Sequence, residues 1–328
     1  MKTRDLILVT GAAGFIGSAI VWELNRRGFE RIIITDVLGT DEKWRNLVPL
    51  RFENYVDTSE LLGRLQSPEL RDVRWVFHLG ACSATTEKDA SYLMENNFQY
   101  TRCLAEWALQ GGRRMVYASS AATYGDGSSG MEDGCESLER YRPLNMYGYS
   151  KHLFDLYAKR QGWLDRLIGL KYFNIFGPNE NHKGDMRSVV HKAFAQIRDT
   201  ASVELFRSYH LDYRDGEQER DFLYVKDAVN ATLHLATHPQ AAGIFNIGSG
   251  IASTWIDLVT PIFHALNVPV SIEFIDMPEV LRGKYQYRTR ADTTRLQSCG
   301  WTGPEYSLSA AVGDCVGQYL ISDLRLGD

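Results

Sequence analysis

The sequence predicts an α/β fold: a doubly wound parallel sheet of the Rossmann type, with a smaller C-terminal α/β substrate lobe. Two observations indicate it. Short apolar runs alternate with longer amphipathic stretches through the first half of the chain, and a glycine-rich turn joins the first run to the first amphipathic stretch. Strands separated by helices form βαβ units, whose parallel sheet is covered by helices on both faces.

The apolar runs are the expected strands, and the amphipathic stretches between them are the expected helices. We expect strands over residues 6–10, 32–35, 75–79, 114–118 and 167–173, and helices near 15–27, 90–109 and 150–160. After about residue 175, Gly177-Pro178 interrupts this pattern and the chain becomes polar and irregular. Residues 203–206 and 244–247 still have the composition of strands, whereas 125–130 and 208–219 have that of loops.

Composition and charge exclude several classes of function. A formal net charge of −5 leaves no basic excess to drive nucleic-acid binding. No apolar run approaches the roughly 20 residues that span a bilayer, and the N-terminus lacks the features of a signal peptide. The five cysteines are scattered without a Cys-x-x-Cys pair, which favours reduced thiols over disulfides or a metal site. We therefore expect a cytoplasmic protein with neither membrane nor nucleic-acid partners and no metal.

The glycine-rich turn predicts a dinucleotide site. Gly11, Gly14 and Gly17 follow the first expected strand and open the first expected helix, the spacing that lets a pyrophosphate approach a helix N-terminus. Asp36 ends the next strand, where an acid binds the adenosine ribose. A carboxylate there favours NAD, but Lys43 and Arg45 are close enough in sequence to favour NADP if the loop folds back, so the choice stays open. We expect residues 1–175 to form the NAD(P)-binding domain and 176–328 the substrate lobe, with about 220–250 returning to the first domain.

A tyrosine and a lysine predict proton transfer beside that site. Tyr147 and Lys151 are spaced to share one helix face, so the ammonium favours the phenolate of a residue that is otherwise a poor base. Ser120 follows an expected strand, at the sheet edge where doubly wound folds bind their ligands. Together these groups predict exchange of a proton with a substrate hydroxyl while a hydride moves to or from the nicotinamide.

With these residues, the chain resembles the extended short-chain dehydrogenases/reductases that act on nucleotide sugars. The resemblance spans nearly the whole length and includes residues 78–81, 97–101, 172–178, 220–227 and 243–248. Residues 80–87 and 118–125, Asn181-His182-Lys183-Gly184 and the 282–286 segment resemble more narrowly the ADP-L-glycero-D-manno-heptose 6-epimerases. That family is oligomeric, carries tightly bound NADP and supplies the heptose of the lipopolysaccharide inner core. The resemblance implies epimerisation at C6 of ADP-D-glycero-β-D-manno-heptose through a 6-keto intermediate.

The narrower resemblance also implies a role for particular positions. Tyr147 and Lys183 are the two acid/base groups, with Lys151 and Ser120 in support. The cofactor set adds to the three glycines Phe15, Ile16, Asp36, Val37, Lys43, Leu79, Gly80, Ala81, Cys82, Ser83, Asn96, Tyr147, Lys151, Ile175 and Lys183. The substrate set is Ser120, Asn174, Asp185, Lys192, Phe206, Arg220 and Tyr285.

Some positions depart from the family pattern, and other readings compete. Val37 stands where the family often has Asn, and Thr58 where it has a second basic residue; both changes weaken the case for NADP. Asp185 and Lys192 replace a frequent Ser and a frequent His near the substrate. Lys171 replaces an Arg. A UDP-hexose 4-epimerase, or another nucleotide-sugar enzyme of this fold, is the closest alternative. The 181–184 segment argues against a hexose 4-epimerase. A 4,6-dehydratase is disfavoured because Ser120-Ala121-Ala122-Thr123 lacks its Thr-Asp-Glu run. A non-catalytic cofactor sensor would commonly lose Tyr147 or Lys151, and both are present.

Overall fold

The computed structural model describes residues 1–136, 138–282 and 285–328. Gly283 and Lys284, within the 282–286 segment of the family resemblance, lie outside these ranges. The centre of the molecule is a seven-stranded sheet whose neighbouring strands are all parallel. Its strands, in spatial order, are β11 (Gly243–Ile247), β6 (Ile168–Tyr172), β5 (Arg114–Ser120), β4 (Val73–His78), β1 (Leu6–Thr10), β2 (Ile32–Asp36) and β3 (Asn54–Asp57).

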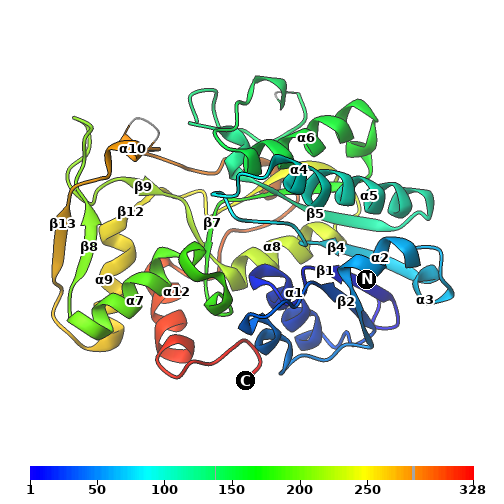
Figure 1. Ribbon diagram of the computed structural model, residues 1–328, viewed down its shortest axis with the longest axis horizontal. Helices are drawn as coiled ribbons and strands as arrows, with labels where there is room; N and C mark the ends of the chain where they lie inside the picture. The colour runs from blue at the N-terminus through cyan, green and yellow to red at the C-terminus, as the bar shows by residue number, and fades with distance from the viewer. Residues whose placement is uncertain (137, 283–284) are drawn as a thin grey trace.

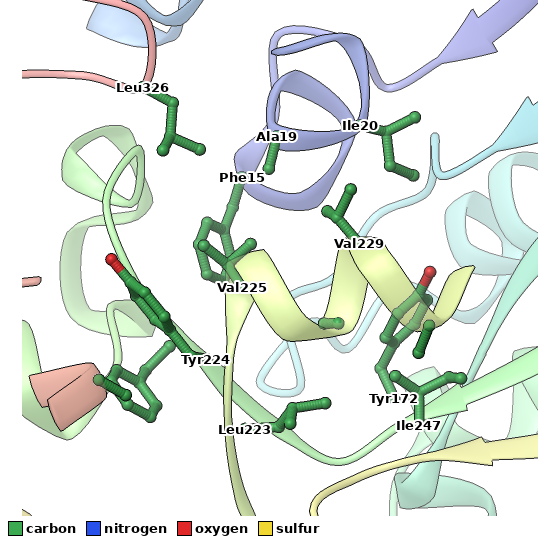
Figure 2. Close-up of a cluster of buried hydrophobic side chains, with 14 of the residues drawn as sticks. Phe15, Ala19, Ile20, Tyr172, Leu223, Tyr224, Val225, Val229, Ile247 and Leu326 are labelled. Atoms are coloured by element: carbon green, nitrogen blue, oxygen red, sulfur yellow. The ribbon is translucent and has the colours of Figure 1, made fainter. Parts of the chain in front are cut away.

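Helices cover both faces of this sheet, which confirms the predicted fold class (Figure 1). One face carries α1 (Phe15–Arg26) and α8 (Val225–Thr237). The other carries α2 (Thr58–Arg64), α3 (Pro68–Arg71), α4 (Ala90–Leu93), α5 (Tyr100–Gln110) and α6 (Met146–Arg160). Buried side chains form one hydrophobic cluster on each face. In Figure 2, Phe15, Ala19 and Ile20 of α1 face Val225 and Val229 of α8, so α8 fixes the helix that follows the glycine turn.

The strand order changes direction between β1 and β4. From β1 the chain first builds outward through β2 and β3, and then returns to build β4, β5, β6 and β11 on the opposite side. Ligands of doubly wound folds bind outside the carboxyl ends of the strands at such a switch point. The topology therefore locates the candidate site beyond the ends of β1, β4 and β5.

The C-terminal elements form a smaller lobe, at the left of Figure 1. It holds three two-stranded pairings: β8 (Val203–Phe206) with β13 (Ile272–Ile275), β7 (Asn174–Phe176) with β10 (Phe222–Tyr224), and β9 (Glu219–Arg220) with β12 (Ser253–Thr254). Its helices are α7 (Val189–Thr200), α9 (Trp255–Leu266), α10 (Glu279–Arg282) and α12 (Leu308–Asp314), whereas α11 (Thr294–Ser298) packs against β11 of the central sheet. Within the described residues, no helix is both long and apolar enough to cross a bilayer.

Two expected helices differ from the observed ones, and one strand of the central sheet was not expected. The helix expected near 150–160 begins at Met146, because the Asn145 side chain accepts a hydrogen bond from the backbone of Gly148 and caps the first turn. The helix expected near 90–109 is helical throughout, but a π-type segment, Met94–Gln99, joins α4 to α5. The strand β3 was not expected, since only Val56 among its four residues is fully buried and the run lacks an apolar signature.

Candidate active site

A cavity of about 700 Å³ lies at the switch point and brings most of the predicted site residues together. The predicted residues in its wall are Gly11, Gly14, Phe15, Ile16, Gly17, Asp36, Lys43, Leu79, Gly80, Ala81, Cys82, Ser83, Ser120, Tyr147, Lys151, Asn174, Ile175 and Lys183. Residues predicted for the cofactor, for catalysis and for the substrate therefore share one continuous space.

The glycine turn has the shape of a pyrophosphate cradle. Gly11 has a φ of +64°, and a Cβ there would lie 2.6 Å from the backbone nitrogen of Gly80. A Cβ on Gly17 would overlap the Gly11 carbonyl oxygen. The helix α1 begins at Phe15 with Gly14 as its N-cap, and no side chain caps the first turn. Its first N–H groups and the positive end of its dipole therefore remain available to phosphate oxygens.

Asp36 stands at the end of β2 with both carboxylate oxygens engaged. Oδ2 accepts a hydrogen bond of 2.8 Å from the backbone of Ala13. Oδ1 accepts one of 2.8 Å from the backbone of Val37 and lies 3.0 Å from Nζ of Lys43. The acid thus holds the glycine turn against β2, and Lys43 offsets its negative charge at the edge of the cavity.

Tyr147 and Lys151 lie one helical turn apart on α6. The Lys151 side chain is buried, and its Nζ donates a hydrogen bond of 2.9 Å to the backbone oxygen of Ala118. Burial lowers the pKa of Lys151 to about 8, whereas the nearby Asp155 carboxylate acts in the opposite direction. The hydrogen bond to Ala118 therefore fixes the Lys151 ammonium against the end of β5, in the wall of the same cavity as Tyr147.

Ser120 acts on the same phenol. Burial among the surrounding groups raises the pKa of Tyr147, while the Ser120 hydroxyl opposes that shift. Ser120 ends β5, and its Oγ accepts a hydrogen bond of 3.1 Å from the backbone of Ala122, which orients the hydroxyl. Tyr147 and Ser120 can thus bind one substrate oxygen between them.

Lys183 enters the cavity from a different segment, the 3₁₀ turn Asn181–Met186. Its Nζ lies 3.3 Å from Oε2 of Glu180 and 5.1 Å from the centre of the Phe15 ring. Because α6 and this turn form separate walls of one cavity, Tyr147 and Lys183 enter the cavity from two directions. That arrangement suits a reaction in which a proton is exchanged on either side of one carbon.

Behind the site, Lys171 forms a buried network under β5. Its side chain is fully buried, Nζ donates a hydrogen bond of 2.6 Å to Oγ1 of Thr123, and Asp155 lies 3.6 Å away. Burial lowers the pKa of Lys171, and the Asp155 carboxylate opposes this. Asp155 also accepts a hydrogen bond of 2.7 Å from Ser119, so the pair ties the end of β5 to α6.

Seven predicted residues lie outside the cavity wall: Val37, Asn96, Asp185, Lys192, Phe206, Arg220 and Tyr285. Val37 is 56% exposed beside Asp36, and Asp185 and Lys192 are exposed as well. Arg220 adjoins the cavity indirectly. Its guanidinium lies 4.9 Å from the Tyr285 ring centre and 5.5 Å from that of Trp255, which does line the cavity. The roles of these seven residues stay predictions.

The structure adds residues that sequence reasoning missed. Glu180, His182, Met186, Arg187 and Trp255 line the cavity as well. Of these, Glu180 carried a detectable signal, since an acid three residues before Lys183 on a helical turn is spaced for an ion pair. The described ranges hold no group of three or more His, Cys, Asp or Glu side chains arranged to bind a metal ion.

Comparisons with known proteins agree with this geometry. The profile of the NAD dependent epimerase/dehydratase family matches residues 7–248. The ADP-L-glycero-D-manno-heptose-6-epimerase of Nitratidesulfovibrio vulgaris (strain DP4) is 52% identical over 316 residues, which cover 96% of this chain and 98% of the relative. The enzyme of the same name from Fusobacterium nucleatum is 42% identical, over 97% of this chain and 99% of the relative.

Solved structures share the fold. The UDP-N-acetylglucosamine 4-epimerase of Methanobrevibacter ruminantium M1 has a TM-score of 0.81 at 25% identity, covering 99% of this chain and 100% of that one. The Helicobacter pylori ADP-L-glycero-D-manno-heptose-6-epimerase has a TM-score of 0.78 at 24% identity, covering 97% and 99%, and at that identity it supports the fold alone. Fold and cavity together define an NAD(P)-type dinucleotide-binding enzyme. More narrowly, the chain belongs to the NAD dependent epimerase/dehydratase family.

Proposed function

We propose that the protein is an isomerase that inverts C6 of ADP-D-glycero-β-D-manno-heptose to give the L-glycero epimer, the heptose donor for the lipopolysaccharide inner core. The observation that carries this proposal is one cavity holding Tyr147 with Lys151 on one wall and Lys183 on another. The 52% identity to a relative named for this reaction, over 96% of the chain, supports the choice of sugar.

The cofactor in this proposal is NADP. The cradle at Gly11, Gly14 and the first turn of α1 fits a pyrophosphate, and Asp36 lies where the adenosine ribose binds in this fold. Lys43 supports NADP over NAD because its ammonium offsets the Asp36 charge and is partly exposed to the cavity. Held by this cradle and by Asp36, the cofactor would supply reversible hydride exchange with C6, which would make C6 a ketone and allow the hydride to return to the opposite face.

In this proposal Tyr147 exchanges the proton of the C6 hydroxyl. The Lys151 ammonium favours the phenolate, and Ser120 donates a hydrogen bond to the same substrate oxygen. Oxidation makes C6 planar, so that rotation about the C5–C6 bond can present either face. Without that step, inversion would require removing an unactivated C–H proton.

Lys183 is the second proton carrier. The hydroxyl points in different directions in the two epimers, so a single group on α6 does not reach both. Lys183 approaches from the Asn181–Met186 turn, beside the ring of Phe15 at the start of α1. Its position supports proton exchange with the epimer that Tyr147 does not serve.

A substrate panel tests the proposal. Purified protein is incubated separately with ADP-D-glycero-β-D-manno-heptose, UDP-glucose and UDP-galactose, and the products are separated by ion-exchange chromatography. We expect conversion of the ADP-heptose alone. Conversion of either UDP-hexose at a comparable rate, with no change in the ADP-heptose, would replace the proposed activity by that of a hexose 4-epimerase.

A further inference from the structure

Glu180 is a buried carboxylate in the wall of the cavity, directly before the turn that carries Lys183. Its side chain is fully buried. Oε2 accepts a hydrogen bond of 2.8 Å from the backbone of Ser188 and lies 3.3 Å from Nζ of Lys183. Oε1 accepts one of 3.2 Å from the backbone of Gly177. A carboxylate taken out of water is costly unless donors and an opposite charge compensate it, and these contacts supply both.

Lys183 supplies the opposite charge. Across the described ranges, it is the one Lys or Arg whose nitrogen lies within 4.0 Å of the Glu180 carboxylate. His191 approaches to 3.9 Å, but its Nε2 donates a hydrogen bond of 2.7 Å to the backbone oxygen of Gly177. Burial lowers the pKa of His191, which favours its neutral form. The ion pair of Glu180 is therefore with the ammonium of Lys183.

The segment that carries the pair is anchored from both sides. Asn179 has a φ of +74°, an uncommon conformation for a residue with a side chain. Its Nδ2 donates to Oγ of Ser18 on α1, and its Oδ1 accepts from the backbone of Leu326 near the C-terminus, both at 2.9 Å. Asn46 donates through Nδ2 to the backbone oxygens of Asn179 at 3.1 Å and of Ala13 at 2.9 Å. The pair is thus held in fixed relation to the glycine turn.

We propose that Glu180 is the positioning residue of Lys183: its buried carboxylate holds Nζ by an ion pair and orients it into the cavity. The proposal rests on the proposed function and deepens it. When epimerisation runs in the direction in which the Tyr147 phenolate accepts the substrate proton, Lys183 is the proton donor. One proton passes from the substrate hydroxyl to Tyr147, another passes from Lys183 to the oxygen of the ketone, and exchange with water restores both groups.

The test compares Glu180→Gln with Lys183→Met. Glutamine keeps the shape and an acceptor oxygen but removes the charge. We expect kcat for epimerisation to fall about 10- to 100-fold while KM stays within about twofold, because the lost interaction acts on proton transfer rather than on substrate binding. In the double variant, kcat should be no lower than in Lys183→Met alone, since both changes remove one function. Glu204→Gln, which removes an exposed carboxylate on β8, is the matched control and should keep wild-type kcat.

A second readout does not depend on turnover. Cofactor-stripped protein is treated briefly with acetic anhydride, and acetylation of Lys183 is followed by peptide mass spectrometry. Without the carboxylate, Nζ loses the partner that holds it by an ion pair and a hydrogen bond, so Lys183 should be acetylated about fivefold faster in Glu180→Gln than in the wild type. Glu204→Gln should leave this rate unchanged.

Glu180→Asp separates positioning from a purely structural role. It keeps the charge on a side chain shorter by one methylene, and should recover part of the lost kcat and the slow acetylation of Lys183. Three outcomes would overturn the proposal. Glu180→Gln could show the wild-type kcat and the wild-type rate of Lys183 acetylation, or its loss of kcat could multiply with that of Lys183→Met. Glu180→Asp could also recover neither kcat nor the slow acetylation of Lys183. Failure of the wild type to interconvert the ADP-heptose epimers would instead contradict the proposed function.

Discussion

The ammonium of Lys43 lies 3.0 Å from the carboxylate of Asp36, at the end of β2 where the adenosine ribose of a dinucleotide binds in this fold. The Asp36 carboxylate also accepts hydrogen bonds from the backbone N–H groups of Ala13 and Val37. The carboxylate therefore holds the glycine turn, while Lys43 places a cation beside it in the cavity wall. An acid at this position consequently does not by itself exclude a 2′-phosphate.

Lys43→Ala should lower the affinity for NADP. The change removes a charge-assisted contact to the 2′-phosphate, worth about tenfold in Kd, and leaves the Asp36 charge unopposed. The affinity for NAD, which lacks that phosphate, should change by less than about twofold. The Kd values are measured by fluorescence titration of cofactor-stripped protein. Arg198→Ala is the control, because Arg198 is exposed on α7, lies outside the cavity wall and pairs with Asp199 at 2.8 Å. Equal losses for both cofactors would contradict the role given to Lys43.

Tyr147→Phe should lower kcat at least about 100-fold, because the variant lacks the hydroxyl that exchanges the substrate proton. Cofactor content, read from the absorbance of the purified protein, should remain that of the wild type. Tyr149→Phe is a matched control on the same helix, since Tyr149 is 45% exposed and lies outside the cavity wall. Equal activity of the two variants would remove Tyr147 from the mechanism.

Activity should decline on the alkaline side as Lys151 loses its proton. Burial lowers the pKa of this ammonium to about 8, so the charged form that favours the Tyr147 phenolate is depleted as the pH rises through that value. We expect kcat to fall above about pH 8. In Lys151→Arg the guanidinium stays charged, so its weaker activity should lack this decline. A wild-type profile that is flat from pH 7 to 10 would show that the charge on Lys151 is not required.

His78 should make the fold sensitive to acid. It is buried between the hydroxyls of Thr10, 2.6 Å from Nδ1, and Thr101, 2.8 Å from Nε2. Burial, reinforced by the Lys151 charge, lowers the pKa of His78 from 6.5 to about 3. Between these values the unfolded chain binds a proton that the folded protein excludes. The free energy of unfolding should therefore fall as the pH drops from 6.5 toward 3, by up to about 1.4 kcal/mol per pH unit from this residue.

Urea unfolding at pH 6.5, 5.5 and 4.5 measures that slope. His78→Gln removes the titrating group, and although it lowers stability at pH 6.5, its slope should be smaller than that of the wild type by about one proton. An unchanged slope would show that other groups account for the acid sensitivity.

The sequence allowed the parallel sheet and the glycine turn to be predicted because both have local signatures. Buried parallel strands such as β1 and β2 begin with continuous apolar runs, and the three glycines have a fixed spacing. The pairing of β8 with β13 and the edge strand β3 have no comparable signature, because short, half-exposed strands depend on their neighbours. The start of α6 at Met146 had a signal in the capping residue Asn145, which was missed.

The same distinction applies to the site. The Tyr147-x-x-x-Lys151 spacing is local, so it was visible in the sequence. The contribution of Lys183 was inferred only by resemblance, because a lysine in an irregular segment has no local signature of function. The burial of Glu180 depends on the backbones of Gly177 and Ser188 closing around it. The ion pair between Lys43 and Asp36 likewise required the chain to fold back from Glu42–Leu47 onto β2.

The central claim is inversion of C6 by a hydride that never leaves the site. Its most direct test is proton NMR of ADP-D-glycero-β-D-manno-heptose incubated with the purified protein in D₂O, without added cofactor. The account predicts that signals of the L-glycero epimer grow and that the C6 proton is retained. Growth of the epimer with deuterium at C6 would contradict hydride return. An unchanged spectrum after addition of NADP and then NAD would contradict the heptose substrate itself.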